Sequence, residues 1–239
     1  IDPSEYFKTE IDDRTVRKEF NLDLISKTLP QISLFTAEEL DLLDNLQAKH
    51  TANIQSLTVA QYQKESERLA IDLSWKSSQI EGNTYSLLET ERLLKDKETA
   101  AGKHKDEATM LLNHKEAIDF IVSNPDYLDP ISIRSIEDIH SILMKELGVD
   151  RNIRTSRVGI TGTNFKPLDN EFQIRDALQQ MCMLVNARTN VFEKSLLLLV
   201  LLSYIQAFED GNKRTARIVI NACLISNIYR PSPVPFTTL

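Results

Sequence analysis

The sequence contains little of what marks a disulfide-rich or membrane-spanning protein. Among its 239 residues are only 2 cysteines, Cys182 and Cys223, and both stand in apolar stretches. Such a sparse pair predicts reduced core residues in a cytoplasmic protein. The longest apolar run, residues 196–202, is far shorter than the roughly 20 residues that span a bilayer. We therefore expect neither a disulfide framework nor a membrane partner.

Glycine and proline are also scarce, with 6 and 8 residues, and basic charge is not in excess. The chain carries 28 basic and 35 acidic side chains, so its formal charge is −7 and its mean field does not attract a polyanion. Hydrophobic residues make up 41% and charged residues 26%, as in a globular protein with one large or two small domains. The chain begins Ile1-Asp2-Pro3 with no signal sequence, and we expect it to be part of a longer protein.

Apolar residues recur at helical spacing along most of the chain, which predicts an all-α fold. Thr36 before two glutamates predicts an N-cap, and Asn124-Pro125 and Gly148 predict breaks after helices. The predicted helices cover about residues 37–48, 58–80, 87–96, 106–122, 131–146, 171–187, 193–206 and 212–228.

Residues 157–167 break this pattern, because β-branched residues are mixed there with Gly159, Gly162 and a turn-forming Thr163-Asn164. This composition predicts a short β-hairpin. An isolated hairpin is barely stable, so it should lie against the helices, where such ribbons often cover a ligand. A surface loop without function is the alternative.

The most informative stretch, residues 206–217, lies between two predicted helices. A helix start presents free N–H groups and the positive end of the helix dipole, and a glycine lets a phosphate approach the backbone closely. Gly211 and Asn212 are therefore predicted to cradle an anion. Arg214 and Arg217 are three residues apart, so both guanidinium groups can reach the same side of the helix.

The basic residues also argue against a purely structural turn. A helix start favours acids, yet this one holds Lys213, Arg214 and Arg217, so we expect an anion to compensate. Asp210 is the carboxylate placed to hold Mg²⁺ against a diphosphate. The alternative to an anion site, on residue chemistry alone, is an ordinary turn whose basic side chains face the solvent.

This stretch is similar to the signature of the Fic (Fido) family, His-Pro-Phe-x-Asp-Gly-Asn-x-Arg-x-x-Arg. The matching residues are Phe208, Asp210, Gly211, Asn212, Arg214 and Arg217. The chain departs from the signature at its first two positions, where Gln206 replaces the family's His and Ala207 its Pro. The resemblance implies a Fic-type helical bundle with a short β-hairpin flap.

Residues 77–83 resemble the family's inhibitory signature, Ser/Thr-x-x-x-Glu-Gly/Asn, on a helix that precedes the core. The signature residues here are Ser77, Glu81 and Gly82. The resemblance implies that Glu81 pairs with Arg217 and displaces the γ-phosphate of ATP. Without the resemblance, Glu81-Gly82 predicts a helix C-terminus with glycine at the C′ position. Both interpretations can hold together.

The predicted hairpin is similar to the Fic flap, which implies docking of a target protein by strand addition. Its strands are expected near residues 158–161 and 165–167, and its flap residues are Val158, Gly159, Ile160 and Thr161. We divide the chain into an N-terminal helical region (1–57), a region with the inhibitory helix packed on the core (58–100), the Fic core (101–229) and a C-terminal tail or linker (230–239).

The resemblance implies a protein adenylyltransferase, which transfers AMP from Mg²⁺·ATP to a Ser, Thr or Tyr hydroxyl of a target protein. Related members move other phosphate-containing groups. Asp210 is implied to hold the Mg²⁺. The residues implied to bind the nucleotide are Gly211, Asn212, Arg214 and Arg217. Gln206 occupies the catalytic position, but an amide cannot take a proton near neutral pH. Losing a general base costs roughly 10²–10⁴ in rate, so we expect slow transfer or none.

Three explanations of Gln206 stay open: a degenerate member that binds nucleotide without transferring it, an engineered inactive variant, or chemistry that needs no base there. Ala207 beside it favours natural drift. A second hypothesis is a Fic-fold interaction module without catalysis. Nucleic-acid recognition by residues 213–217 is disfavoured, because three basic residues in an acidic chain neutralise few phosphates. The histidines outside the motif are predicted to be ordinary helical or surface residues: His50, His104, His114 and His140.

Overall fold

The computed structural model describes residues 3–10, 13, 18–160 and 165–227, and their regular structure is helical, as the apolar pattern predicted. The predicted tail at residues 230–239 lies outside the described residues. The elements are α1 (Pro3–Lys8), the π-helical turn η2 (Leu24–Thr28), the 3₁₀ turn η3 (Leu29–Gln31), α2 (Ala37–Gln55), α3 (Val59–Ile80), α4 (Leu87–Asp96), α5 (Lys105–Ser123), the 3₁₀ turn η4 (Pro125–Leu128), α6 (Ile133–Leu143), α7 (Glu171–Ala187), α8 (Val191–Ile205) and α9 (Asn212–Ser226).

Helix ends follow the capping residues of the sequence. Thr36 caps α2 with a full capping box, in which its side chain accepts from the Glu39 amide. The helices predicted at 87–96 and 171–187 have the bounds of α4 and α7. The structure extends α2 to Gln55, beyond the predicted end at 48. Residues 49–55 contain few apolar side chains, so apolar periodicity could not reveal this part of the helix.

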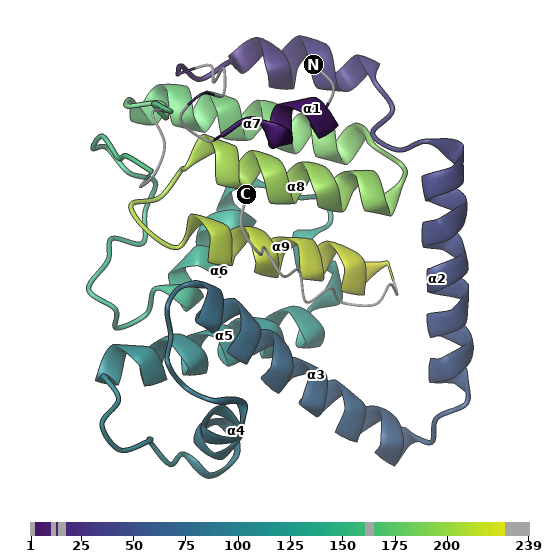
Figure 1. The fold of residues 1–239 in the computed structure, drawn as a ribbon, viewed down its shortest axis with the longest axis vertical. Coiled ribbons are helices and arrows are strands. Elements are labelled where there is room, and N and C mark those ends of the chain that lie inside the picture. Colours follow the sequence, from purple (N-terminus) through teal and green to yellow (C-terminus); the bar gives the residue numbers. More distant parts are fainter. Residues whose placement is uncertain (1–2, 11–12, 14–17, 161–164, 228–239) are drawn as a thin grey trace.

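Helix α8 lies between α7 and α9, as Figure 1 shows. A helix that is apolar on most sides belongs inside a protein, and all the α8 leucines except Leu196 are buried. Its partner α9 buries most of its length, including polar residues near its start. These neighbours fix both ends of the turn that joins α8 to α9.

The other face of α9 packs against α3, α5 and α6. A second, smaller apolar cluster lies beside this face, where Tyr85 and Leu93 pack against Leu111 of α5. It anchors the turn that follows α3. The end of α3 is thereby held next to the beginning of α9, although the two segments are far apart in the sequence.

Helix α2 stands apart along one edge of the molecule in Figure 1. None of its residues is buried. The bundle core is built from the turn containing Ile25 and from helices α3 and α5 to α9. The boundaries proposed at residues 57, 100 and 229 remain predictions.

The predicted β-hairpin is wrong for the residues that the structure describes. None of these forms a strand, and Thr161 lies outside them. Lys166 instead makes an isolated parallel bridge with Glu19, so its backbone partner comes from the N-terminal part of the chain. A two-stranded ribbon has little stability of its own, and here a distant segment supplies the pairing.

Both cysteines are free thiols, as predicted. Burial raises the pKa of Cys182 to about 12, which suits an unreactive core residue. Among the described residues, no helix has the length and apolar character needed to cross a membrane.

Candidate functional site

The turn between α8 and α9 is built from residues with left-handed backbone at both ends. Gln206 ends α8 with φ 52°, and Gly211 caps the start of α9 with φ 76°. Between them, Phe208 is 1% exposed and belongs to the core. Asn212 closes the turn, because its side chain both accepts from the Phe208 amide (2.9 Å) and donates to the Phe208 carbonyl (2.8 Å).

Gly211 is required here for two reasons. Its positive φ strains any residue that has a Cβ. In addition, a Cβ at this position would lie 2.5 Å from the terminal methyl of Met144. The sequence analysis selected this glycine for close phosphate approach, whereas the structure shows its missing side chain facing Met144.

His140 supports the turn from α6. Its ring stacks on Phe208 with centroids 3.7 Å apart and an interplanar angle of 5°. The Nε2 atom lies 3.0 Å from the Asp210 carbonyl and Nδ1 lies 3.1 Å from the Arg151 carbonyl. Burial lowers the pKa of His140, so near pH 7 the neutral ring donates to one of these carbonyls at a time.

Arg154 ties the turn to the segment that follows α6. It is buried, and it donates through Nε to the Gln206 carbonyl (2.7 Å) and through Nη2 to the Leu168 carbonyl (2.5 Å). Its amide also donates to the Ala207 carbonyl (3.0 Å). Sequence reasoning missed His140 and Arg154, since both act on backbone carbonyls, which have no sequence signature.

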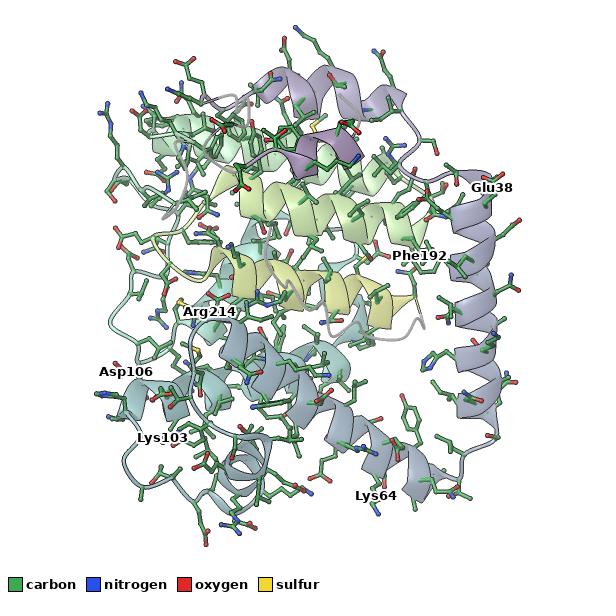
Figure 2. The ribbon with its side chains drawn as sticks, viewed as in Figure 1. Glu38, Lys64, Lys103, Asp106, Phe192 and Arg214 are labelled. Atoms are coloured by element: carbon green, nitrogen blue, oxygen red, sulfur yellow. The ribbon has the colours of Figure 1, made fainter. Side chains whose placement is uncertain are left out.

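The two arginines of the motif are buried at the beginning of α9. Arg214 is 3% exposed and Arg217 is 4% exposed. Figure 2 shows Arg214 within the ribbon near the start of α9, whereas Glu38 lies at the outer edge of the molecule. The Arg214 Nη2 donates to the Asp210 carboxylate at 2.7 Å. This carboxylate also accepts from the Gly211 amide at 2.6 Å.

Arg217 is held by the end of α3. Its Nη2 donates to the Glu81 carboxylate at 2.6 Å, and its Nε donates to the Ser77 hydroxyl at 2.8 Å. Burial lowers the pKa of Arg217, and the Glu81 carboxylate opposes that shift. Ser77 and Glu81, predicted from the inhibitory signature, therefore both contact the second arginine of the motif.

These contacts leave three nitrogen atoms of the two arginines without a hydrogen-bond acceptor. The Nε and Nη1 atoms of Arg214 and the Nη1 atom of Arg217 are buried without a hydrogen-bond partner. An unsatisfied buried donor of a charged group is costly, and an anion is the partner it favours. The site therefore holds two guanidinium groups with spare N–H bonds beside a helix N-terminus.

Glu81 projects from a well-anchored turn. It is the C-cap of α3, and Gly82 follows with φ 90°, which is the predicted helix end with glycine at C′. The Asn83 side chain donates to the Glu107 carbonyl (2.8 Å), and the Thr84 hydroxyl donates to the Glu107 carboxylate (2.7 Å). The start of α5 thus fixes the turn that presents Glu81.

His114 of α5 is also buried, and neither of its ring nitrogens has a hydrogen-bond partner. Burial lowers its pKa to about 3, and the charges of Arg217 and Arg214 add to this effect. His114 is therefore neutral near pH 7. It lies in a helix, as the sequence analysis expected, but its buried ring lacks the hydrogen bonds of an ordinary buried histidine.

Gln206 keeps its side chain on its own helix, where Nε2 donates to the Ser203 carbonyl at 2.6 Å. Its backbone carbonyl accepts from Arg154. Within the described chain, no hydrogen bond or ion pair joins Val158, Gly159 or Ile160 to the turn at residues 208–212. The structure gathers the motif and the end of α3 into one site, to which none of the described residues 158–160 forms a hydrogen bond or ion pair.

Comparison with known families agrees with this arrangement, because the model of the Fic/DOC family matches residues 130–224. The chain contains a Fic/DOC domain. The match spans the turn, both motif arginines and Arg154, whereas Ser77 and Glu81 precede it.

Solved structures share the fold of this Fic/DOC domain and its surroundings. A Fic-domain-containing signaling protein of Bacteroides thetaiotaomicron has 20% identity and a TM-score of 0.67 over 78% of this chain and 74% of its own. Fic-1 of C. elegans has 20% identity and a TM-score of 0.68 over 84% of this chain. A Fic family protein of Desulfovibrio desulfuricans has 17% identity and a TM-score of 0.67 over 80% of this chain. This chain covers only 62% and 58% of the latter two.

Substituting Gly211→Ala should destabilise the Fic/DOC domain through both backbone strain and the contact with Met144. Gly102→Ala is the matched control, because Gly102 has almost the same φ (75°) but no atom within 4 Å of the added Cβ. We expect Gly102→Ala to lower the free energy of unfolding by about 1–2 kcal/mol. Gly211→Ala should cost roughly 1–3 kcal/mol more. Urea denaturation measures both free energies of unfolding. Equal decreases in the two variants would show that the Met144 side chain moves aside without an energetic cost.

The neutral burial of His114 should make the domain acid-sensitive. Folding lowers the pKa of His114 from 6.5 to about 3, so the unfolded chain binds a proton at this residue at a higher pH than the folded chain does. The free energy of unfolding therefore falls as the pH decreases from about 6.5 towards 3. The slope contributed is at most about 1.4 kcal/mol per pH unit. Urea denaturation at pH 7 and at pH 5 measures the effect. Between these two pH values, the free energy of unfolding should fall less in His114→Leu than in the parent. His104→Leu, at an exposed histidine, is the control. If the unfolding free energy of His114→Leu falls with pH as steeply as that of the parent, His114 is not the cause of the acid sensitivity.

Proposed function

We propose that this chain binds the phosphates of Mg²⁺·ATP at the turn between α8 and α9. The observation that carries the proposal is the pair of buried guanidinium groups, Arg214 and Arg217, with spare N–H donors beside a helix N-terminus. Phosphate oxygens accept from such donors in geometries that a guanidinium fork matches. The family resemblance supplies the nucleotide's identity.

The residues present suit both the phosphates and a divalent cation. Asp210 is half-exposed at the mouth of the turn, and its two oxygens retain lone pairs beyond their present hydrogen bonds. Mg²⁺ takes one or two carboxylates together with phosphate oxygens, so Asp210 alone suffices on the protein side. The cation would neutralise phosphate charge, while the backbone amides at the start of α9 and the two arginines orient the phosphates.

The reaction class that fits is AMP transfer to a Ser, Thr or Tyr hydroxyl of a protein. The hydroxyl oxygen would attack the α-phosphorus, the bond to the β-phosphate oxygen would break, and pyrophosphate would leave. The hydroxyl proton needs an acceptor, which Gln206 cannot be. His140 and His114 do not replace it, because His140 is stacked on Phe208 and His114 is enclosed beside two arginines. Transfer should therefore be slow.

Glu81 would act as an inhibitor of this site. Its carboxylate occupies the Arg217 Nη2 that a phosphate oxygen would otherwise engage. Removing it frees one charged donor and one positive charge in the interior of the protein. The pair is anchored at both ends, since Glu107 fixes the turn after α3 and α9 fixes the arginine.

A binding module without catalysis is the second candidate. It is favoured by Gln206, whose side chain bonds to Ser203 on its own helix and offers no base. Transfer of another phosphate-containing group would use the same phosphate contacts. The two experiments below separate nucleotide binding from group transfer.

Glu81→Gly should raise the affinity for Mg²⁺·ATP, because Arg217 becomes available to the phosphates. A charge-assisted hydrogen bond is worth about 1.5–3 kcal/mol, so we expect roughly a 10-fold to 100-fold gain by isothermal titration calorimetry. Glu98→Gly removes the same charge from an exposed loop and is the matched control.

Adding Arg217→Ala to Glu81→Gly should abolish that gain. If Glu81→Gly binds Mg²⁺·ATP no better than the parent, the inhibitory pairing is wrong. If neither form binds it at all, the phosphate site itself is wrong.

Gln206→His in the Glu81→Gly background should restore a general base and raise incorporation of radiolabelled AMP by roughly 10²–10⁴. Gln206→Asn in the same background is the control, because asparagine is polar and tolerates the left-handed backbone at this position but has no basic nitrogen. Labelling after incubation with ATP and Mg²⁺, followed by mass spectrometry, measures self-modification without a known target. Equal labelling of the His and Asn variants would exclude the missing base as the limiting feature.

A further inference from the structure

The turn between α8 and α9 lacks the histidine that would take a proton in the proposed reaction, and two nearby carboxylates are already engaged. Asp210 pairs with Arg214, and Glu81 pairs with Arg217. The side chain of Gln206 is an amide and offers no basic nitrogen. A proton acceptor for an attacking hydroxyl therefore has to come from another side chain of the turn.

Glu209 is the remaining carboxylate of this turn. It is exposed, and none of the described residues forms an ion pair with it. Its Oε1 accepts a hydrogen bond from the Ser156 hydroxyl at 3.2 Å, whereas its second oxygen has no hydrogen bond with a described residue. A hydroxyl that donates to a side chain at about 2.6–3.2 Å is the contact that a general base requires. Glu209 thus already accepts the hydrogen of a hydroxyl group.

The position of this hydroxyl is fixed by Arg154. The Arg154 amide donates to the Ala207 carbonyl at 3.0 Å, and its Nε donates to the Gln206 carbonyl at 2.7 Å. Its Nη1 donates to the Ser156 carbonyl at 2.6 Å. Arg154 is 2% exposed, so a buried side chain holds the segment that carries Ser156 along the turn. The contact with Glu209 is therefore more than a chance meeting of two surface side chains.

Glu209 also has a suitable place in the turn. It directly precedes Asp210, the residue to which the proposed function assigns the Mg²⁺, and it lies three residues before the first residue of α9. In protein kinases a carboxylate likewise takes the proton of the substrate hydroxyl, while other groups neutralise the phosphates. The turn therefore has a carboxylate for the cation and a separate carboxylate for a hydroxyl.

We propose that Glu209 is the proton acceptor of this domain, and that the Ser156 hydroxyl marks the position of the attacking hydroxyl. The target hydroxyl displaces that of Ser156 from the carboxylate. Its oxygen forms a bond to the α-phosphorus, the bond to the β-phosphate oxygen breaks, pyrophosphate leaves, and the proton goes to Glu209. Water reacts in the same way and gives free AMP. The proposal rests on the proposed function, because it needs ATP at the turn.

Glu209 supplies only part of the rate that a histidine would give. A carboxylate is a weaker base than an imidazole, and this one is exposed and shared with Ser156. Of the roughly 10²–10⁴ that a general base contributes, we therefore expect about 10-fold from Glu209. Such a contribution is consistent with slow transfer and with a further gain from Gln206→His.

The test measures pyrophosphate release from Mg²⁺·ATP, which counts transfer to a hydroxyl and to water alike, in variants that all carry Glu81→Gly. Adding Glu209→Gln should lower kcat roughly 10-fold and leave KM unchanged, because only the proton acceptor is lost. In the Gln206→His background the same substitution should change kcat by less than about 2-fold, because the imidazole takes the proton. Ser156→Ala should raise the rate roughly 2- to 10-fold, since a competing hydrogen bond is removed.

The controls separate loss of the base from loss of the site. Glu98→Gln removes the same charge from an exposed loop and should not change the rate. Isothermal titration calorimetry should give equal affinities for Mg²⁺·ATP with and without Glu209→Gln. The proposal is overturned if Glu209→Gln binds ATP and releases pyrophosphate as fast as Glu81→Gly alone, or if its loss is equally large in the Gln206→His background. If no variant binds Mg²⁺·ATP, the proposed function is wrong and this assignment is wrong with it.

Discussion

The constraint on which the site depends is the burial of two guanidinium groups at the positive end of α9. Arg214 and Arg217 face a helix dipole of their own sign and little solvent. Two carboxylates reached from different directions, Asp210 within the turn and Glu81 from α3, balance this charge. Three donor atoms of the arginines still lack partners, so the carboxylates compensate the charge without satisfying the hydrogen bonds. A site in this condition favours an additional or a replacement anion.

The groups that shape the turn are distinct from those that would contact a ligand. Arg154 and His140 hold carbonyls of the turn from outside, Asn212 closes it from within, and Met144 fills the space below Gly211. Each of these side chains is committed to packing or to the backbone, which leaves ligand contacts to the spare N–H donors of Arg214 and Arg217. Such division of roles lets the turn keep its shape when Glu81 leaves Arg217, because none of its supports depends on that ion pair.

The sequence predicted what depends on local chemistry. The helices follow apolar periodicity and their own caps, as at Thr36, and the motif residues lie together because they are neighbours in one turn. The hairpin failed because the partner of Lys166 is Lys18, and long-range backbone pairing has no local signal. For the same reason Arg154 went unnoticed, and His140 was predicted to be only an ordinary helical or surface residue. Gly211 was selected correctly but for another cause, since its contact with Met144 depends on how α6 packs against the turn.

Glu81, which pairs with Arg217 from the end of α3, is N-terminal to the matched family span. Tethering makes it a competitor at high effective concentration, so one ion pair suffices against a dilute ligand. A phosphate would have to displace this carboxylate from Arg217, while the pair of Asp210 with Arg214 stays in place. Glu81 and a phosphate would therefore compete for one guanidinium group and not for the whole turn.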